Sequence, residues 1–227
     1  MEKNTRFLIV CVGLLFALAS SGSAAVPGLV GWWAFDEGAG DVAADGSGNG
    51  NDGVINDATW IAGQLGSALD FNGSAYVDVP PACFATIANQ VTIAFWVNIP
   101  AANLSQSNFI MAAFSDPANN GARVLSMHLP WAGNTVYFDS SGPTYDRINK
   151  AVAADELVDA WSHWAFVKDA DTGDKLIYRN GELWHSGAGS KPLQGADVTK
   201  FTIGTKASLA EGWFTGMIDD VQLYNIA

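Results

Sequence analysis

The chain has 227 residues, of which 49% are apolar, 11% aromatic and only 15% charged, and its formal net charge is −12. The high apolar and aromatic content excludes an intrinsically disordered chain, and the excess of carboxylates argues against a protein that neutralises nucleic acid phosphates. A disulfide framework is excluded as well, because the chain has only 2 cysteines, Cys11 and Cys83.

The first residues have the three-part pattern of a secretory signal peptide. Lys3 and Arg6 precede an apolar run over 7–18, which is too short to span a bilayer, and small residues follow it up to Ala25. We expect residues 1–25 to be removed on export, and an uncleaved membrane anchor is the alternative. The mature protein is then a single domain over 26–227 that is secreted or displayed at the cell surface.

The rest of the chain consists of short strand patterns separated by turns. The dipeptides Asn72-Gly73 and Asn180-Gly181 are typical of tight β-hairpins. A loop rich in Gly, Asp and Asn spans 36–53, and a weak helical pattern spans 155–160. The expected strands are, in chain order, 29–35, 68–71, 75–79, 91–99, 109–114, 123–129, 135–139, 161–168, 175–179, 182–185, 200–204 and 214–224. This spacing predicts an all-β fold, a two-sheet antiparallel sandwich or jelly roll.

Three stretches of the chain carry a family resemblance. The first is residues 29–55, beginning LVGWWAFDEG, with 63–79; the second is WSHWAFVKD at 161–169 with KLIYRNGELW at 175–184; the third is FTIGTKA at 201–207 with FTGMIDDVQLYN at 214–225. Together they resemble the LamG-like group of the concanavalin A-like lectin/glucanase superfamily. The resemblance implies a two-sheet antiparallel jelly roll whose N- and C-terminal strands lie side by side. It also implies a mostly non-catalytic group of carbohydrate binders, adhesion modules and spacers.

The loop before residue 53 is crowded with carboxylate and amide oxygens, the ligands that Ca²⁺ prefers. Asp45, Asn49 and Asn51 match the family pattern, and the resemblance places Asp219 beside this loop, with Asp220 as the weaker candidate. We therefore expect a structural calcium ion held by Asp45, Asn49, Asn51 and Asp219. The alternative is that these residues only form turns, in which Asp and Asn side chains hydrogen-bond to the backbone.

The stretch after residue 123 combines side chain types that hold sugars. Alternation along two adjacent strands places His128, Tyr137 and Asp139 on one polar face, with Trp131 at its rim and Arg147 just beyond. An aromatic ring packs on the apolar side of a sugar, and polar groups bond its hydroxyls. These five residues form the expected ligand-binding site. The alternative is that His128 and Trp131 fill the core or cap a turn.

Catalytic motifs are absent from the sequence. Retaining glycosidases need two carboxyl groups about 5–5.5 Å apart, and none of Glu37, Glu156, Glu182 and Glu211 begins the same-strand acidic pattern of glucanases. We expect a secreted, non-catalytic carbohydrate- or glycoconjugate-binding module stabilised by calcium, with no nucleic acid partner and no membrane insertion after signal cleavage. A structural or adhesion domain that binds a surface protein is the alternative, and a glycoside hydrolase is the third.

Overall fold

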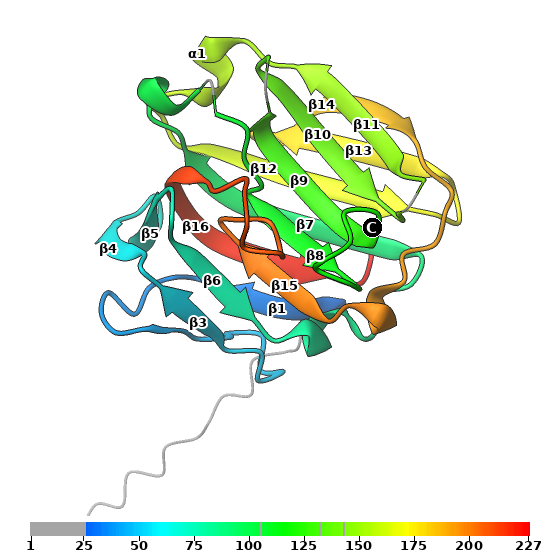
Figure 1. Cartoon of the computed structure of the whole chain (residues 1–227), viewed down its shortest axis with the longest axis horizontal. Helices are drawn as coiled ribbons and strands as arrows, with labels where there is room; N and C mark the ends of the chain where they lie inside the picture. Colours follow the sequence, from blue (N-terminus) through cyan, green and yellow to red (C-terminus); the bar gives the residue numbers. More distant parts are fainter. Residues whose placement is uncertain (1–25, 105, 132, 143) are drawn as a thin grey trace, which may run out of the picture.

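Two antiparallel β-sheets lie face to face in the computed structural model (Figure 1). The structure describes residues 26–104, 106–131, 133–142 and 144–227, and the predicted signal peptide over 1–25 lies outside them. Within the described ranges, no helix is long and apolar enough to cross a membrane. The predicted all-β sandwich is confirmed. The helical elements are short: η1 (Pro81–Phe84), η2 (Ala101–Asn103), α1 (Ala154–Leu157) and η3 (Gly195–Asp197).

Each sheet has a fixed order of strands. The order in the first, sheet A, is β14 (Glu182–Ala188), β13 (Asp174–Arg179), β12 (Ser162–Asp169), β7 (Gln90–Asn98), β16 (Thr215–Tyr224), β5 (Ser67–Asn72) and β4 (Thr59–Ala62), with β1 (Leu29–Trp33) also paired to β16. The order in the second, sheet B, is β11 (Asp146–Ala151), β10 (Thr135–Ser140), β9 (Arg123–Trp131), β8 (Met111–Phe114), β15 (Lys200–Ile203), β6 (Tyr76–Val79), β3 (Gly53–Asn56) and β2 (Val42–Ala43). The pairing of β1 with β16 confirms that the first and last strands are neighbours.

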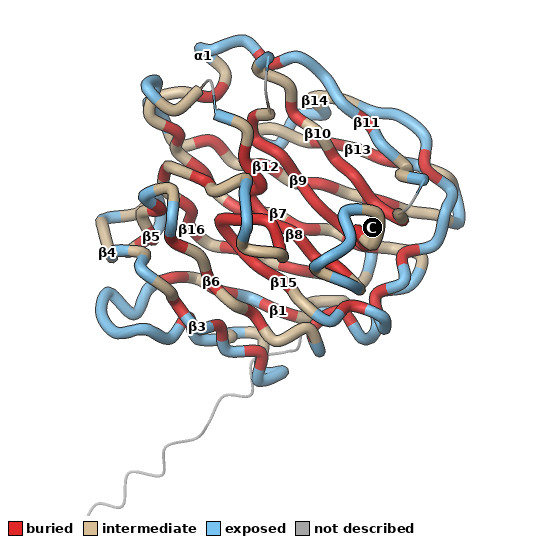
Figure 2. The backbone as a smooth tube through the Cα atoms, viewed as in Figure 1, coloured by how far each residue is buried: buried red, intermediate tan, exposed pale blue. Residues whose placement is uncertain are grey.

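The core lies between the two sheets, where Figure 2 shows the central strands as buried. Strand β7 alternates strictly, so that Phe95 faces the core and Trp96 faces outward. The ring of Phe95 stacks on Phe166 of β12 with centroids 5.9 Å apart, and Phe138 of β10 meets Phe166 at 5.4 Å. The contact between Phe138 and Phe166 joins sheet B to sheet A directly behind the expected ligand-binding site.

One of the two predicted hairpins forms and the other does not. Asn180 and Gly181 join β13 to β14, both with positive φ, as the turn type requires. The hairpin predicted at Asn72-Gly73 is wrong, because β5 belongs to sheet A and β6 to sheet B. The side chain of Asn72 accepts a hydrogen bond from the backbone N–H of Ser74, so this turn redirects the chain between sheets instead of folding it back.

Several elements differ from those expected along the chain. The loop over 36–53 contains the short strand β2, and strands β3, β4 and β11 were not predicted. The expected helix over 155–160 is shorter and begins earlier, as α1. The most consequential difference is β11, because it places Arg147 on a strand paired with β10 and not just beyond the two expected strands.

The outer face of sheet B, turned away from the core, is partly covered by loops. The N–H of Phe109 donates to the carbonyl of Gly212, and the Phe109 ring packs with Ala112, Phe114 and Ala207 in a second apolar cluster. Residues Arg123 to Pro130 of β9 are consequently buried on both faces of the strand. The expected ligand-binding side chains lie at the edge of this cover.

Candidate functional site

The register of three strands brings the expected ligand-binding residues together. Tyr137 of β10 lies opposite His128 of β9, and Asp139 lies opposite Arg147 of β11. Because residues opposite each other in a sheet share a face, the four side chains point to the outer side of sheet B. The shared face that alternation predicts is therefore present in the structure.

A buried carboxylate organises this group. Asp139 is fully buried and receives Arg147 through two hydrogen bonds, Nε to Oδ1 at 2.5 Å and Nη2 to Oδ2 at 2.6 Å. Arg123 donates from Nη1 to Oδ2 at 2.7 Å, and Nε2 of His128 lies 3.6 Å from the same oxygen. Bidentate pairing of this kind fixes the orientation of the Arg147 guanidinium group and strengthens its bond to the carboxylate. Sequence reasoning did not select Arg123, which stands at the first position of its strand.

The charge states follow from these contacts. Burial by itself would raise the pKa of Asp139, but the hydrogen bonds from Arg147 outweigh it and hold that pKa well below its usual range. Burial lowers the pKa of His128 more than Asp139 raises it. The Nδ1 atom of His128 lies 2.8 Å from the carbonyl oxygen of Asn108, so Nδ1 carries the proton of the neutral ring.

Aromatic rings surround the polar group. The His128 ring lies 4.7 Å from the centroid of Trp131 and 5.8 Å from that of Tyr137. The Arg147 guanidinium sits 4.8 Å from the Tyr137 ring centroid, and the Arg123 guanidinium sits 4.8 Å from that of Tyr145. Cations over aromatic faces are held in place without losing their hydrogen bonding capacity.

These side chains line a small cavity of about 140 Å³, bordered by Arg123, His128, Trp131, Tyr137 and Arg147. We call it the Asp139 pocket. Its deep side is buried, whereas Trp131 and Tyr137 are partly exposed and 39% of the Arg147 side chain is accessible. Trp131 also packs edge-on against Phe109 at 5.6 Å, so it borders the pocket and contacts the outer apolar cluster at the same time.

Two buried lysines hold the strands behind the pocket. Lys168 donates to Asp146 Oδ2 at 2.9 Å, and Lys175 donates to the carbonyl oxygens of Phe138 and Asp146 and to Ser140 Oγ. Both lysines are fully buried on the inner face of sheet A. This lysine clamp ties the adjoining ends of β10 and β11 to sheet A. It therefore fixes the register that sets Arg147 against Asp139.

The predicted calcium ligands fall into two places. Asp45 Oδ1 accepts the backbone N–H groups of Trp32 and Ser47, and its Oδ2 accepts that of Asn51. Burial alone would raise the pKa of Asp45. Hydrogen bonds from Ser47, Asn51 and Trp32 lower it by more, so the pKa lies below its usual value. The amide groups of Asn49 and Asn51 donate to the carbonyl of Val30. The interactions of these residues in the structure are therefore those of the turn alternative.

Asp219 has a different environment. Its Oδ2 accepts the N–H of Leu65 at 2.8 Å, and its buried Oδ1 has no hydrogen bond partner in the described part of the chain. Burial raises the pKa of Asp219 to about 6. Asp220 is the residue linked to the Asp45 loop. It accepts the indole N–H of Trp32, and the backbone N–H of Trp32 donates to Asp45. The four predicted ligands thus do not share one set of contacts.

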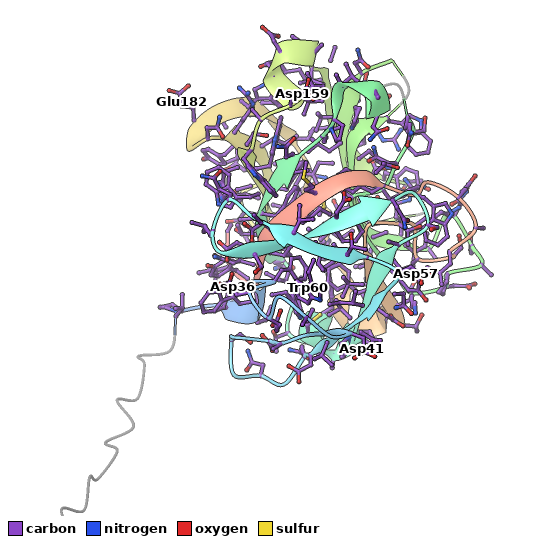
Figure 3. All side chains as sticks on the ribbon, turned by 90° about the vertical axis from the view of Figure 1, so that its left-hand side faces the viewer. Asp36, Asp41, Asp57, Trp60, Asp159 and Glu182 are labelled. Carbon is purple, nitrogen blue, oxygen red and sulfur yellow. The ribbon has the colours of Figure 1, made fainter. Side chains whose placement is uncertain are left out.

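Acidic side chains elsewhere are dispersed. Figure 3 shows Asp159 and Glu182 near one end of the molecule and Asp36, Asp41 and Asp57 near the other. Across the described residues, no group of three or more His, Cys, Asp or Glu side chains is arranged to hold a metal ion.

A second aromatic hollow lies on the outer face of sheet A. It measures about 580 Å³ and is lined by Trp96, Trp161, His163, Asn180 and Gly181. Trp96 and His163 are opposite each other in the sheet, with ring centroids 5.2 Å apart. This hollow is wider than the Asp139 pocket and has no charged residue in its lining.

Known structures share the architecture. Domain 4 of AbnA, an extracellular GH43 arabinanase from Geobacillus stearothermophilus solved in complex with arabinotriose, matches with a TM-score of 0.66 and 22% identity, over 86% of this chain and 91% of that one. The botulinum neurotoxin DC binding domain, solved in complex with rat synaptotagmin II, matches with a TM-score of 0.65 and 14% identity, over 88% of this chain and 48% of that one. The binding domain of botulinum neurotoxin serotype C1 matches with a TM-score of 0.67 and 14% identity, over 88% of this chain and 49% of that one. This chain thus spans about half of the toxin domains.

The likeness to these structures shows the fold alone, and a search of curated proteins found no match to the sequence. The family model Laminin_G_3, described as concanavalin A-like lectin/glucanases superfamily, matches residues 71–227. That range contains most strands of both sheets and every residue of the Asp139 pocket. The chain is therefore a member of the concanavalin A-like lectin/glucanases superfamily.

Proposed function

We propose that this protein is an exported, non-catalytic module that binds a carbohydrate or glycoconjugate in the Asp139 pocket. The observation that supports the proposal is a prearranged polar group at the bottom of a partly open pocket with aromatic rings at its rim. Fixed hydrogen bonding groups orient a bound ligand. The aromatic rings of Trp131 and Tyr137 at the rim of the pocket offer flat apolar surface to a sugar ring.

The structural neighbours are consistent with this proposal. One is a domain of an extracellular arabinanase solved with a bound arabinotriose, and others are binding domains of toxins. Export agrees with the signal peptide pattern over 1–25.

The non-catalytic role is supported by the acidic pair whose spacing comes nearest to that of glucanases, Asp169 and Asp171. These two residues form a turn, because Asp169 Oδ1 accepts the N–H of Asp171.

Substituting Trp131 tests the proposal. On a glycan array, Trp131→Ala is expected to weaken binding by about 5- to 150-fold, since an aromatic anchor at an interface contributes about 1–3 kcal/mol. The melting temperature should fall less than for a core tryptophan, because Trp131 is only partly buried.

The matched control is Trp161→Ala in the hollow on sheet A, which should leave glycan binding unchanged. An array on which wild type binds no saccharide would speak for the alternative, a domain that recognises a surface protein. Loss of binding in Trp161→Ala alone would place the ligand on the other sheet.

We further propose that a structural calcium ion is held at Asp219 and not at Asp45. The support is the buried Oδ1 of Asp219, which has no hydrogen bond partner among the described residues. Asp36 bonds the turn over 63–67, as Asp219 does, because its carboxylate accepts the N–H of Ser67. Calcium prefers carboxylate oxygens, so Asp219 Oδ1 is the proposed ligand and Asp36 is a second candidate from this turn; the charge of the ion would neutralise the buried Asp219 carboxylate.

A chelator separates this proposal from the sequence-based set. EGTA is expected to lower the melting temperature of wild type and of Asp45→Asn by several degrees, because calcium binds only the folded state. It should not change the melting temperature of Asp219→Asn. An equal response of both variants, or no response in wild type, contradicts calcium binding at Asp219.

The pH dependence in chelator gives a second measurement. The folded-state pKa of Asp219 is about 6, above the unfolded value of 3.8, so its contribution to stability is complete below about pH 4 and is lost as pH rises through 6. Without calcium, wild type should lose stability across this range relative to Asp219→Asn.

A further inference from the structure

The charge of the Asp139 pocket is opposite to that of the whole chain. The protein has a net charge of −12. The pocket nevertheless gathers two guanidinium groups, Arg123 and Arg147, around a single carboxylate, Asp139. With His128 neutral, the local balance is one positive charge. Glu211 also interacts electrostatically with Arg123, but it is paired with Lys206, so one positive charge remains uncompensated.

Hydrogen bond donors in the pocket are also incompletely used. The Nε atom of Arg123 is buried and has no hydrogen bond partner among the described residues, and only 9% of the Arg123 side chain is accessible. Arg147 commits Nε and Nη2 to Asp139, and its Nη1 is not part of that pair. A buried guanidinium N–H with no acceptor is unfavourable, so an acceptor brought by a ligand gains more here than at the surface.

The size of the pocket limits what enters it. Pockets that enclose a whole ligand measure about 300–1,000 Å³, whereas the Asp139 pocket measures about 140 Å³. The space suits one substituent of a sugar ring, and the ring itself is left outside against Trp131 and Tyr137. A planar, singly charged carboxylate matches the planar guanidinium groups better than a hydroxyl does.

We propose that the Asp139 pocket takes the carboxylate of a single acidic sugar, of the uronic or sialic acid class, between Arg123 and Arg147, while Trp131 and Tyr137 contact the ring. The inference rests on the proposed carbohydrate-binding function and names its ligand class. The acidity of the remaining chain favours one terminal acid over a polyanionic glycan, since further negative groups outside the pocket would be repelled.

Pairs of ligands that differ only in charge test the inference. Isothermal titration calorimetry compares methyl glucuronide, methyl galacturonide and N-acetylneuraminic acid with their methyl esters. Wild type is expected to bind one of the acids at least about tenfold more tightly than its ester, because a hydrogen bond to a charged group exceeds one to a neutral group by that order.

Two variants assign the preference to the pocket. Arg147→Gln should bind acid and ester alike, and Arg147→Lys should retain part of the difference because it keeps the charge. Trp131→Ala should weaken acid and ester by the same factor. Arg147 is partly exposed, and Arg123 still pairs with Asp139 in its absence, so folding is preserved and melting temperatures verify it.

The outcomes separate this inference from the proposed function. Equal binding of acid and ester, with both lost in Trp131→Ala, overturns the acidic-sugar inference and leaves the carbohydrate-binding function standing. A preference for the acid that survives in Arg147→Gln also overturns it. Absence of binding to any saccharide, charged or neutral, rejects both.

Discussion

Replacing Asp139 with alanine is expected to lower the free energy of unfolding by about 3–5 kcal/mol, the range for removing one member of a buried charged group. Asp139 is fully buried and is the carboxylate that both Arg123 and Arg147 bond. Without it, the Arg123 guanidinium stays buried with no carboxylate hydrogen-bonded to it among the described residues. For a domain of this size the melting temperature should fall by roughly 10 °C.

Urea unfolding measures the change, and Asp155→Ala provides the control. Asp155 is exposed in the first turn of α1, so its removal should alter stability by less than about 0.5 kcal/mol. A loss of under 1 kcal/mol in Asp139→Ala would show that the buried network contributes little and that the pocket is not held by it.

The same carboxylate predicts a dependence on acid. Since the folded-state pKa of Asp139 lies below its unfolded value, its stabilisation is present above about pH 4 and is lost as pH falls towards the folded-state pKa. Asp139→Asn should remove this part of the acid sensitivity, and the two unfolding curves should converge at low pH.

Replacing Lys175 with alanine should produce the second large effect, a loss of about 3–5 kcal/mol. The substitution opens a cavity and removes a buried donor from three acceptors: the carbonyl oxygens of Phe138 and Asp146 and the hydroxyl of Ser140. Because the lysine clamp holds the ends of β10 and β11, glycan affinity should decrease as well. The exposed Lys150 at the far end of β11 provides the matched control.

Lys175 also predicts a change at alkaline pH. Burial, with a smaller effect from Lys168, lowers the pKa of Lys175 to about 7, below its unfolded value of 10.5. The unfolded chain therefore binds more protons between these values, so stability should rise as pH increases from about 7 to 10. Thermal unfolding of wild type and Lys175→Met checks this, and a rise of equal size in both would exclude Lys175 as its source.

The parts of the fold that were predictable are those where apolar residues alternate. In β7 and β12 every second residue points inward and is buried, as Phe95 and Phe166 are, and both strands form where the pattern indicates. Strand β11 lacks this signal, because Ile148 is its only buried residue and its neighbours are polar or charged. Such an edge strand is defined by pairing with β10, which a local pattern does not record.

The candidate site was predictable only in part for the same reason. Period-two alternation placed His128, Tyr137 and Asp139 on one face. Arg123 escaped selection because a bulge between Ala113 and Phe114 shifts the register where it pairs with β8. Lys175 resembled a surface residue, since its burial depends on acceptors that lie 29 or more positions away in the chain.

A crystal structure of the protein bound to the saccharide selected on the array tests the central claim most directly. We expect the sugar ring to lie against Trp131 and Tyr137 and one of its substituents to enter the pocket between Arg123 and Arg147. A saccharide bound instead in the hollow formed by Trp96 and Trp161 on sheet A, with the Asp139 pocket unchanged, would contradict it.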